Sequence, residues 1–445
     1  MGSGLCIAGV ARVSCSLYIL ALLCSDAAGQ LASRITPPPT LDVGETFGAD
    51  ALPLGDIDCD GKADMLIVEQ YAGLARDHML LWAVASGSHM QRYLLRLDHW
   101  KNKPPGWSDL RAQDVADYDA RVFGGGDLDG DGNDDFVTVR SKDRQSTVNI
   151  AGYGGVDGAN LWAYELRWRE VAYATIIGDV DGDGRADVLV CGFQSHQKSA
   201  AVDMCVISAK TGGTIATPIA PSGFTSSVSY VARLKHANSE CAHGVAFIAS
   251  LPEAACQVFT LKWSSGKAAW AVRTISTKQP YVRSITCVDD ANADGLCDLM
   301  LGYDDTVRVL SGADGAVLCT ITGIPGEGFG RSVCSVWETR SAEYRGAFVG
   351  APAAGVAEGA LYKVDPALAK KQKLDIETQL SLWHLAEKVR DVGDRDGDGC
   401  GDVVVCCDHS ISGEPGTVLI VSGANGSVIT KYRKEKGRIV ESQAQ

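Results

Sequence analysis

Residues 179–190 read Asp-Val-Asp-Gly-Asp-Gly-Arg-Ala-Asp-Val-Leu-Val, an aspartate-rich loop that leads directly into a short apolar segment. The pattern Asp-x-Asp-x-Asp-Gly-x-x-Asp occurs five times, with Asn replacing one Asp in the fourth copy. Positions 1, 3, 5 and 9 of the copies are candidate metal ligands: Asp56, Asp58, Asp60, Asp64; Asp127, Asp129, Asp131, Asp135; Asp179, Asp181, Asp183, Asp187; Asp290, Asn292, Asp294, Asp298; and Asp394, Asp396, Asp398, Asp402.

The loop chemistry favours calcium, with up to five ions per chain. Alternate spacing directs the side chains of positions 1, 3 and 5 toward one centre, and the Gly at position 6 accepts the positive φ of a tight turn. Calcium takes six to eight hard oxygen ligands in flexible geometry. An EF-hand would require a carboxylate at position 12 and helices on both sides. Position 12 is instead a strand-forming residue in every copy: Ile67, Thr138, Val190, Leu301 and Val405.

The spacing of the loops predicts seven equivalent units. The first Asp of each copy is separated from the next by 71, 52, 111 and 104 residues, so two gaps are double. A period of about 50 to 55 residues therefore places two units without a loop near residues 235 and 337.

A second marker repeats in step with the loops. A turn between two apolar runs follows in each unit, and such turns are the strongest local hairpin signal. The seven turns are Ser86-Gly87, Asp157-Gly158, Thr211-Gly212, Ser265-Gly266, Asp314-Gly315, Asp365-Pro366 and Asn425-Gly426.

A unit with a loop between its first two strands and a hairpin between its last two is a four-stranded antiparallel sheet. The sequence therefore predicts an all-β fold, a seven-bladed β-propeller of four-stranded antiparallel blades with calcium loops in five of them. An open solenoid is the alternative, but it would have shorter repeats and capping units.

Two further segments resemble the FG-GAP repeat family, which forms the propeller of the integrin α-subunit head. Residues 329–333 read Phe-Gly-Arg-Ser-Val and are followed by Val-Gly-Ala-Pro at 349–352, while Phe47-Gly48 precedes the first loop at the matching place. The resemblance covers residues 42–434. It implies a propeller domain over this range that binds calcium and acts in binding or cell adhesion.

The N-terminus resembles a secretory signal peptide. Arg12 precedes the apolar run at 16–23, and small residues follow at 27–29. We expect a signal peptide at 1–29, a linker at 30–41 and a polar C-terminal tail at 435–445. The apolar run is too short for a membrane span, so we expect no stable membrane insertion and a secreted, extracellular or periplasmic product.

Twelve of the fifteen cysteines lie beyond the signal region, an even number that favours disulfides in an exported protein. The candidate pairs are Cys191 with Cys205, Cys241 with Cys256, Cys287 with Cys297, and Cys319 with Cys334. Zinc at Cys406, Cys407 and His409 is a competing hypothesis, although the segment lacks a second ligand pair at finger-like spacing.

The formal net charge is −14, which argues against nucleic acid as a partner. Much of this charge has a local cause, because the five loops contain nineteen Asp ligands. Five calcium ions would bring the charge to about −4.

The partner is expected to be an extracellular protein or a carbohydrate. The first repeat carries an insertion with Trp100 and Trp107 among basic residues, a composition that suits a sugar ring or a protein hot spot. A propeller-fold polysaccharide lyase or hydrolase is the alternative, since fold alone does not decide function. We assign no catalytic residue. A quinone-cofactor enzyme would use Trp162 and Trp270, for which packing between blades is the simpler reading.

Overall fold

The computed structural model shows an all-β protein with no helix among the residues that it describes. These residues are 45–71, 78–85, 91–98, 120–142, 147–168, 170–193, 202–218, 228–234, 244–250, 256–264, 267–275, 282–337, 344–353, 359–376, 385–407, 416–435 and 438–443. Within them, no helix has the length and apolarity needed to cross a membrane.

The strands form seven antiparallel sheets across this described part of the chain, and in each sheet the strands follow one another in chain order. The first three sheets contain β1 (Glu45–Gly55), β2 (Asp64–Tyr71), β3 (His78–Val84) and β4 (Gln91–Asp98); β5 (Ala120–Gly124), β6 (Phe136–Lys142), β7 (Thr147–Tyr153) and β8 (Asn160–Leu166); and β9 (Glu170–Ile177), β10 (Asp187–Phe193), β11 (Asp203–Ile207) and β12 (Thr214–Ala216).

The remaining sheets follow the same plan, and only the last has five strands. They contain β13 (Val228–Leu234), β14 (Gly244–Ser250), β15 (Cys256–Ser264) and β16 (Lys267–Ile275); β17 (Ser284–Val288), β18 (Asp298–Gly302), β19 (Thr306–Leu310) and β20 (Val317–Thr322); β21 (Ser332–Trp337), β22 (Tyr344–Ala351), β23 (Ala360–Asp365) and β24 (Lys370–Lys373); and β25 (Lys388–Asp391), β26 (Val403–Cys407), β27 (Thr417–Val421), β28 (Val428–Glu435) and β29 (Arg438–Gln443).

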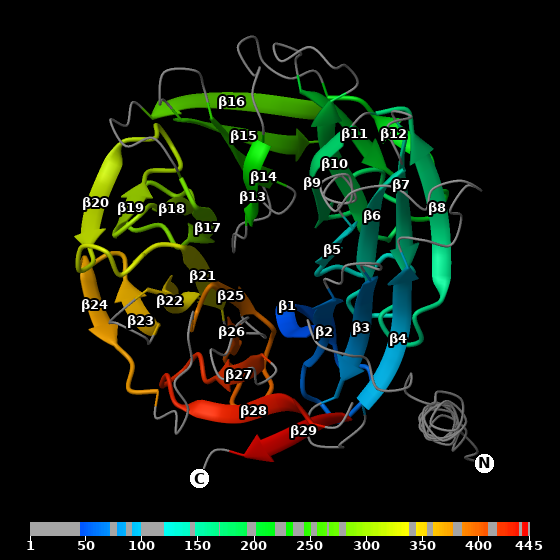
Figure 1. Ribbon diagram of the computed structural model, residues 1–445. Coiled ribbons are helices and arrows are strands. Elements are labelled where there is room, and N and C mark those ends of the chain that lie inside the picture. The colour runs from blue at the N-terminus through cyan, green and yellow to red at the C-terminus, as the bar shows by residue number, and fades with distance from the viewer. Residues whose placement is uncertain are drawn as a thin grey trace, which may run out of the picture.

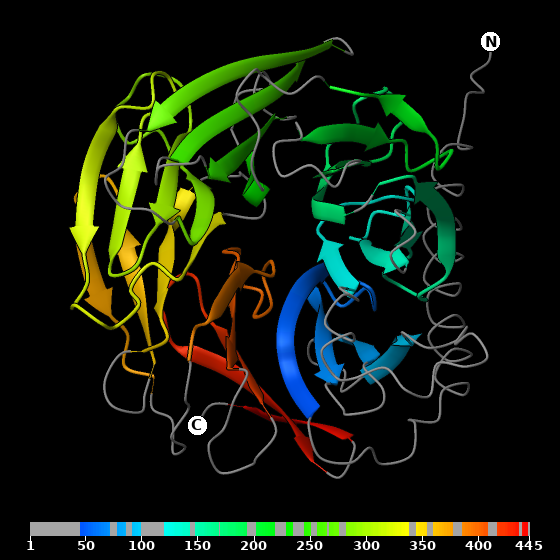
Figure 2. The same cartoon turned by 45° about the horizontal axis from the view of Figure 1, so that its top comes forward.

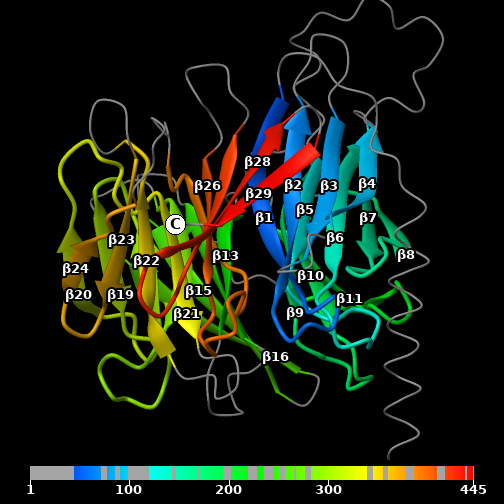
Figure 3. The same cartoon turned by 90° about the horizontal axis from the view of Figure 1, so that it is seen from below.

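The sheets are arranged around a central axis, as in a β-propeller (Figure 1). The first strand of each sheet lies nearest the axis and contacts the first strand of the next sheet, and β1 contacts β25 and β26 of the last. The two ends of the described chain therefore lie side by side, β1 in blue and the last sheet in red (Figure 2). Seen edge-on, the group of sheets carries its strand connections on two faces (Figure 3).

The cores lie between neighbouring sheets. Central strands pack against a neighbour on both faces, which explains why β18, β26 and β27 are buried along their whole length and mostly apolar instead of alternating with polar residues. One cluster joins Val139 and Ile150 of the second sheet to Val190 of the third, and Trp162 packs in it as predicted.

The Phe-Gly pairs occupy equivalent places in the first and sixth sheets. Phe47 and Phe329 are fully buried. Gly330 has a φ of 106°, and a Cβ there would lie 2.5 Å from the carbonyl oxygen of Tyr303 in the preceding sheet. Glycine is therefore required at this position both by its backbone conformation and by the close approach of the neighbouring sheet.

Each predicted hairpin turn falls between the third and fourth strands of its sheet. Four turns that the structure describes end in a glycine with positive φ: Gly158, Gly212, Gly315 and Gly426. The two predicted units without a metal loop also fall in place, because β13 ends at Leu234 and β21 ends at Trp337. Their connections to the next strands lie outside the described residues.

The C-terminal segment differs in part from the expected tail. The predicted boundary at residue 434 falls within β28, and Arg438–Gln443 forms β29, a fifth strand paired with β28. The reason is local. Ile439 and Val440 are β-branched residues that favour a strand, and Ile439 is buried in the core shared with the first sheet. Residues 1–44, with the predicted signal peptide and linker, lie outside the described residues.

The disulfide predictions that the structure tests are wrong. Cys191 lies opposite Met204, and Cys205 lies opposite Val190, so the two thiols point to opposite faces of their sheet. Cys287 Sγ donates a hydrogen bond to the carbonyl of Val288, and Cys319 Sγ to that of Pro366, as thiols do. Cys241 lies outside the described residues. The spacing of cysteines in the sequence could not supply the strand register that decides these pairings.

Candidate metal centres

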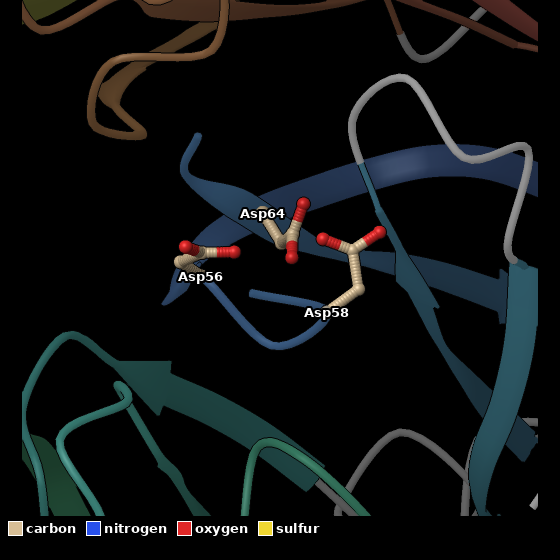
Figure 4. A group of neighbouring side chains, drawn as sticks. All are labelled: Asp56, Asp58 and Asp64. Carbon is tan, nitrogen blue, oxygen red and sulfur yellow. The ribbon is translucent and has the colours of Figure 1, made fainter. Parts of the chain in front are cut away.

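The five aspartate loops occupy one equivalent position. Each joins the first strand of its sheet to the second, and position 9 opens the second strand or directly precedes it. In Figure 4, the carboxylates of Asp56, Asp58 and Asp64 point toward one another from the first loop. Equivalent strand ends in a ring of sheets lie on one face, so the five loops share a face of the molecule.

The ligand oxygens of each loop lie within 4.8 Å of one another. In the first, second, third and fifth loops the grouped residues are positions 1, 3 and 9. In the loop at 290–298, where Asn292 occupies position 3, they are positions 1, 5 and 9. The groups are Asp56, Asp58, Asp64; Asp127, Asp129, Asp135; Asp179, Asp181, Asp187; Asp290, Asp294, Asp298; and Asp394, Asp396, Asp402.

The remaining position 5 residues, Asp60, Asp131, Asp183 and Asp398, lie outside those groups of three. The Oδ1 of each accepts the backbone N–H of the residue two further on, at 2.8 to 3.0 Å. Asn292 turns its side-chain amide inward, because its Nδ2 donates to Asp294 Oδ2 at 2.8 Å.

Backbone conformation explains the loop's glycines. The position 6 glycines have φ between 86° and 93°, and a Cβ on any of the five would meet no atom within 4 Å. The requirement at position 6 is therefore for positive φ, not for space. Position 1 completes the turn, since its Oδ2 accepts the position 6 N–H in every loop, for example Gly184 to Asp179 at 2.8 Å.

Position 4 also has a positive φ, a feature that the sequence analysis missed. Three loops have glycine there, whereas Cys59 and Ala293 adopt φ of 61° and 60° without being glycine. The three glycines, Gly130, Gly182 and Gly397, were the available signal, because the same position carries Gly in most copies of the loop.

Position 9 is the buried anchor of each loop. Asp64, Asp135, Asp187, Asp298 and Asp402 are all 0% exposed. The Oδ2 of each accepts the position 2 backbone N–H, as from Leu128 to Asp135 at 2.6 Å. In four sheets the Oδ1 also accepts an N–H from the turn between the third and fourth strands, as from Gly155 to Asp135 at 2.7 Å.

The loops contact the neighbouring sheet through position 8. Ala186 N–H of the third loop donates to the Asp127 carbonyl of the second at 2.8 Å, and Ala63 N–H of the first loop donates to the Asp394 carbonyl of the last. Gly401 N–H likewise reaches the Trp337 carbonyl at the end of β21. Each bond runs to the preceding sheet, and the first sheet bonds to the last.

Burial is the main cause of raised pKa values among the position 9 carboxyls. Burial, supplemented by the other carboxylates of the loop, raises the pKa of Asp135 and Asp402 to about 7 and that of Asp187 and Asp298 to about 6. Desolvation opposes the charged form unless a positive charge accompanies it. An all-oxygen donor set with this need for positive charge fits a hard divalent cation such as calcium.

The candidate zinc site at Cys406 and Cys407 is not formed. Cys406 and Cys407 are consecutive on β26 and belong to different core clusters on opposite faces, so they cannot converge on one zinc ion. The zinc hypothesis is therefore wrong for this pair. His409, Trp100 and Trp107 lie outside the described residues.

Two cavities accompany the loops. One of about 570 Å³ lies on the axis and is lined by first strands of six sheets, including Thr286, Ser335 and Arg390. Three of its polar side chains contact each other: Thr286 Oγ1 lies 3.0 Å from Ser335 Oγ, which accepts the Trp337 indole N–H at 3.0 Å. The second cavity, of about 580 Å³, lies between the fifth and sixth sheets.

Comparison with known proteins gives no family for this chain. No protein-family model matches the sequence. No curated protein sequence matches it either. Solved structures of similar fold include that of the Dos1 propeller, at 10% identity and a TM-score of 0.48 over 82% of this chain and 76% of that one. Another is the PL11 rhamnogalacturonan lyase of Bacillus licheniformis, at 15% identity and a TM-score of 0.41 over 88% and 71%.

Proposed function

We propose that this chain is an exported, calcium-loaded, seven-bladed β-propeller of the FG-GAP kind that binds an extracellular protein or carbohydrate. One observation carries the proposal: five loops at the same place in five sheets each bring three ligand residues within 4.8 Å. Repetition of one donor set at equivalent positions is the mark of a selected site, whereas isolated acidic clusters on a surface are common.

Calcium is the cation that suits these loops best. Every grouped ligand is an aspartate, and position 9 is fully buried, so the site offers hard oxygens and a strong need for positive charge. Five ions would offset ten of the negative charges and leave a net charge of about −4.

The ions would serve mainly to stabilise the ring. Position 8 of each bonded loop donates to the preceding sheet, so fixing a loop also fixes its contact with that sheet. Because the bonds run through the first and last sheets as well, we propose that the seven sheets close into one ring. The Phe-Gly contacts between sheets support the same arrangement.

A rigid ring of this kind is suited to presenting loops to a partner. Thr286 and Ser335 in the axial cavity contact each other, and Ser335 also accepts the Trp337 indole N–H, which favours a binding module over catalysis at these residues. We propose Trp100 and Trp107 as partner contacts, and export by the segment at 1–29, with no stable membrane insertion and no nucleic acid partner.

Protein and glycan arrays probed with the purified chain test the function. We expect saturable binding in 1 mM calcium that chelator abolishes, and weaker binding when Trp100 and Trp107 are both replaced by Ala. The proposal fails if the chain binds no array component in calcium. It also fails as the sole function if an acidic polysaccharide is cleaved at a steady rate.

A further inference from the structure

The cavity between the fifth and sixth sheets has the form of a small-molecule site. Its volume of about 580 Å³ lies within the range of about 300–1,000 Å³ that such sites usually have. Its walls come from the segment after β17, which begins the fourth metal loop, and from β22, β23, β24 and the turn between the last two. The cavity therefore opens on the face that carries the metal loops.

A buried hydroxyl in this cavity has no partner. Tyr344 lines the cavity, and its Oη is buried without a hydrogen bond to any residue that the structure describes. The aromatic ring of Tyr344 packs edge-on against that of Trp337, with the two ring centroids 5.2 Å apart. A buried hydroxyl without a partner destabilises the fold, so its retention calls for a ligand or water at this place.

Three carboxylates line the cavity with this hydroxyl: Asp290 of the fourth metal loop, and Asp289 and Asp365 outside the metal groups. Asp289 and Asp365 line the cavity, and both are exposed at its mouth. Burial raises the pKa of Tyr344 well above its usual value, and the charges of Asp365 and Asp289, which line the same cavity, raise it further. A hydroxyl and the two carboxylates outside the metal groups are suited to a ligand with several hydroxyl groups.

The lysines that line the cavity do not make it a site for an anionic ligand. Lys363 Nζ donates to the carbonyls of Gly423 and Ala424, and Lys371 Nζ donates to that of Thr322. Both ammonium groups are thus directed to backbone oxygens of other sheets. Lys370 also lines the cavity and is the cross-strand partner of Asp365. The balance favours an uncharged ligand over an anion.

Part of the wall is apolar. Val364 and Pro366 are buried and line the cavity, together with Ala291. A sugar ring presents apolar C–H groups on one face and hydroxyls at its edge, so it can cover such a wall while its hydroxyls reach Tyr344, Asp289 and Asp365. We propose that this cavity binds the ring of a neutral sugar, and that the Tyr344 hydroxyl is its buried hydrogen-bonding partner. The assignment rests on the carbohydrate-binding function proposed above.

Ligand-observed saturation-transfer NMR on the full calcium-loaded chain tests the site. The probes are the methyl glycosides of glucose, galactose, mannose and N-acetylglucosamine, with glucosamine as a charged comparison. We expect saturable binding of at least one neutral glycoside. Tyr344→Phe should weaken that binding about tenfold or more, the effect of losing roughly one good hydrogen bond. The same variant should keep or raise the melting temperature, because it removes a buried group without a partner.

Thr138→Val is the matched control, because Thr138 Oγ1 is another buried hydroxyl without a partner among the described residues and lies on β6, away from the cavity. It should leave glycoside binding unchanged. Asp365→Asn should weaken binding by a similar factor to Tyr344→Phe. The proposal is overturned if no neutral glycoside binds, if only glucosamine binds, or if Tyr344→Phe binds as the native chain does. Binding of calcium is read separately from the chelator melt, so failure of this site leaves the metal centres untouched.

Discussion

At the scale of single residues, the metal loops combine unstrained and strained backbone. Position 4 adopts positive φ in all five loops, and Cys59 and Ala293 are the copies where the residue is not glycine. A residue with a Cβ in the left-handed region costs about 1 kcal/mol or more. The first and fourth loops therefore carry strain that the others lack.

Ala293→Gly should stabilise the chelated protein by about 0.5–1 kcal/mol, since the relief of strain exceeds the added entropy of the unfolded chain. Urea unfolding measures the change. The matched variant is Gly182→Ala, which places a Cβ in open space at a φ of 81° and should destabilise by a similar amount. Equal stability of both variants and the native chain would contradict the strain argument.

The buried position 9 carboxylates give the metal-free protein an unusual pH dependence. Asp135 and Asp402 have pKa values of about 7 when folded, above the ordinary 3.8. Between these values the folded chain holds protons that the unfolded chain releases, so the free energy of unfolding falls as pH rises. In chelator, the urea midpoint should be lower at pH 7.5 than at pH 5.5.

Calcium should reverse this trend, because it binds the deprotonated carboxylates and its affinity rises with pH. Melts in 1 mM calcium at the same two pH values are the comparison. A chelated protein that is more stable at pH 7.5 than at pH 5.5 would show that these groups are not proton acceptors in the folded chain.

At the scale of the element, one carboxylate joins two connections of the same sheet. Asp135 accepts Leu128 N–H from its own loop and Gly155 N–H from the turn between β7 and β8. That turn has the same pattern in four sheets, with a backbone bond such as Gly212 N–H to the Ser208 carbonyl at 2.9 Å. The metal loop and the hairpin are therefore built as one unit.

Asp135→Asn should destabilise even the chelated protein, by about 1–3 kcal/mol, because its amide cannot accept both buried N–H bonds. Asp131→Asn is the control in the same loop: Asp131 is exposed and accepts only from Asn133, so water can replace it. Chelated melts should separate the two variants, and calcium titration should show weaker binding for Asp135→Asn. Identical chelated melts would exclude the anchoring role.

The sequence predicted these elements well where the signal was local. Loop and turn residues repeat in step with the sheets, so the ends of β13 and β21 fall where the repeat predicts them without any local motif. The disulfide pairs could not be predicted, because a shift of one residue in register moves Cys205 to the other face of β11. The double role of position 9 was also hidden, since its second contact lies twenty residues away in the chain.

At the scale of the whole molecule, the first and last sheets are joined by side chains as well as by the loops. Arg390 of β25 makes two bonds to Asp50 of β1, at 2.7 and 2.9 Å, and Lys388 lies 3.3 Å from the same carboxylate. Glu69 of β2 accepts the Trp82 indole N–H and pairs with Lys434 of β28 in a buried contact. The pairs Arg390–Asp50 and Lys434–Glu69 connect residues more than 300 positions apart.

Asp50→Asn should lower stability at pH 7 by about 1–2 kcal/mol, discounted because the Arg390 side chain is 42% exposed. Burial would raise the pKa of Asp50, but Arg390 and Lys388 outweigh it and lower the pKa below 3.8. A lowered pKa stabilises the fold above pH 3.8 and loses that effect as pH falls through the folded value. The difference between native and variant urea midpoints should therefore shrink below pH 4, and a constant difference would contradict the ion pair.

The sequence contains no local signal for three features of the assembled sheets: the Asp50–Arg390 pair, the cavity at Tyr344 and the strand β29. Asp50 and Arg390 become partners only once the first and last sheets meet, and the cavity at Tyr344 exists only between two sheets. The fifth strand of the last sheet, β29, was likewise hidden, because it is short and strongly polar at its end. Sequence repeats predict units, whereas contacts between units depend on how those units pack.

The central claim is that five loops each hold a calcium ion. Native mass spectrometry of the chain after equilibration in 1 mM calcium counts those ions directly. At 100 times the dissociation constant each ion adds about 2.7 kcal/mol to stability, so full loading should also raise the melting temperature strongly. We predict five calcium ions per chain, and four after Asp187→Ala. Retention of no calcium, or a count that Asp187→Ala does not change, would contradict the account.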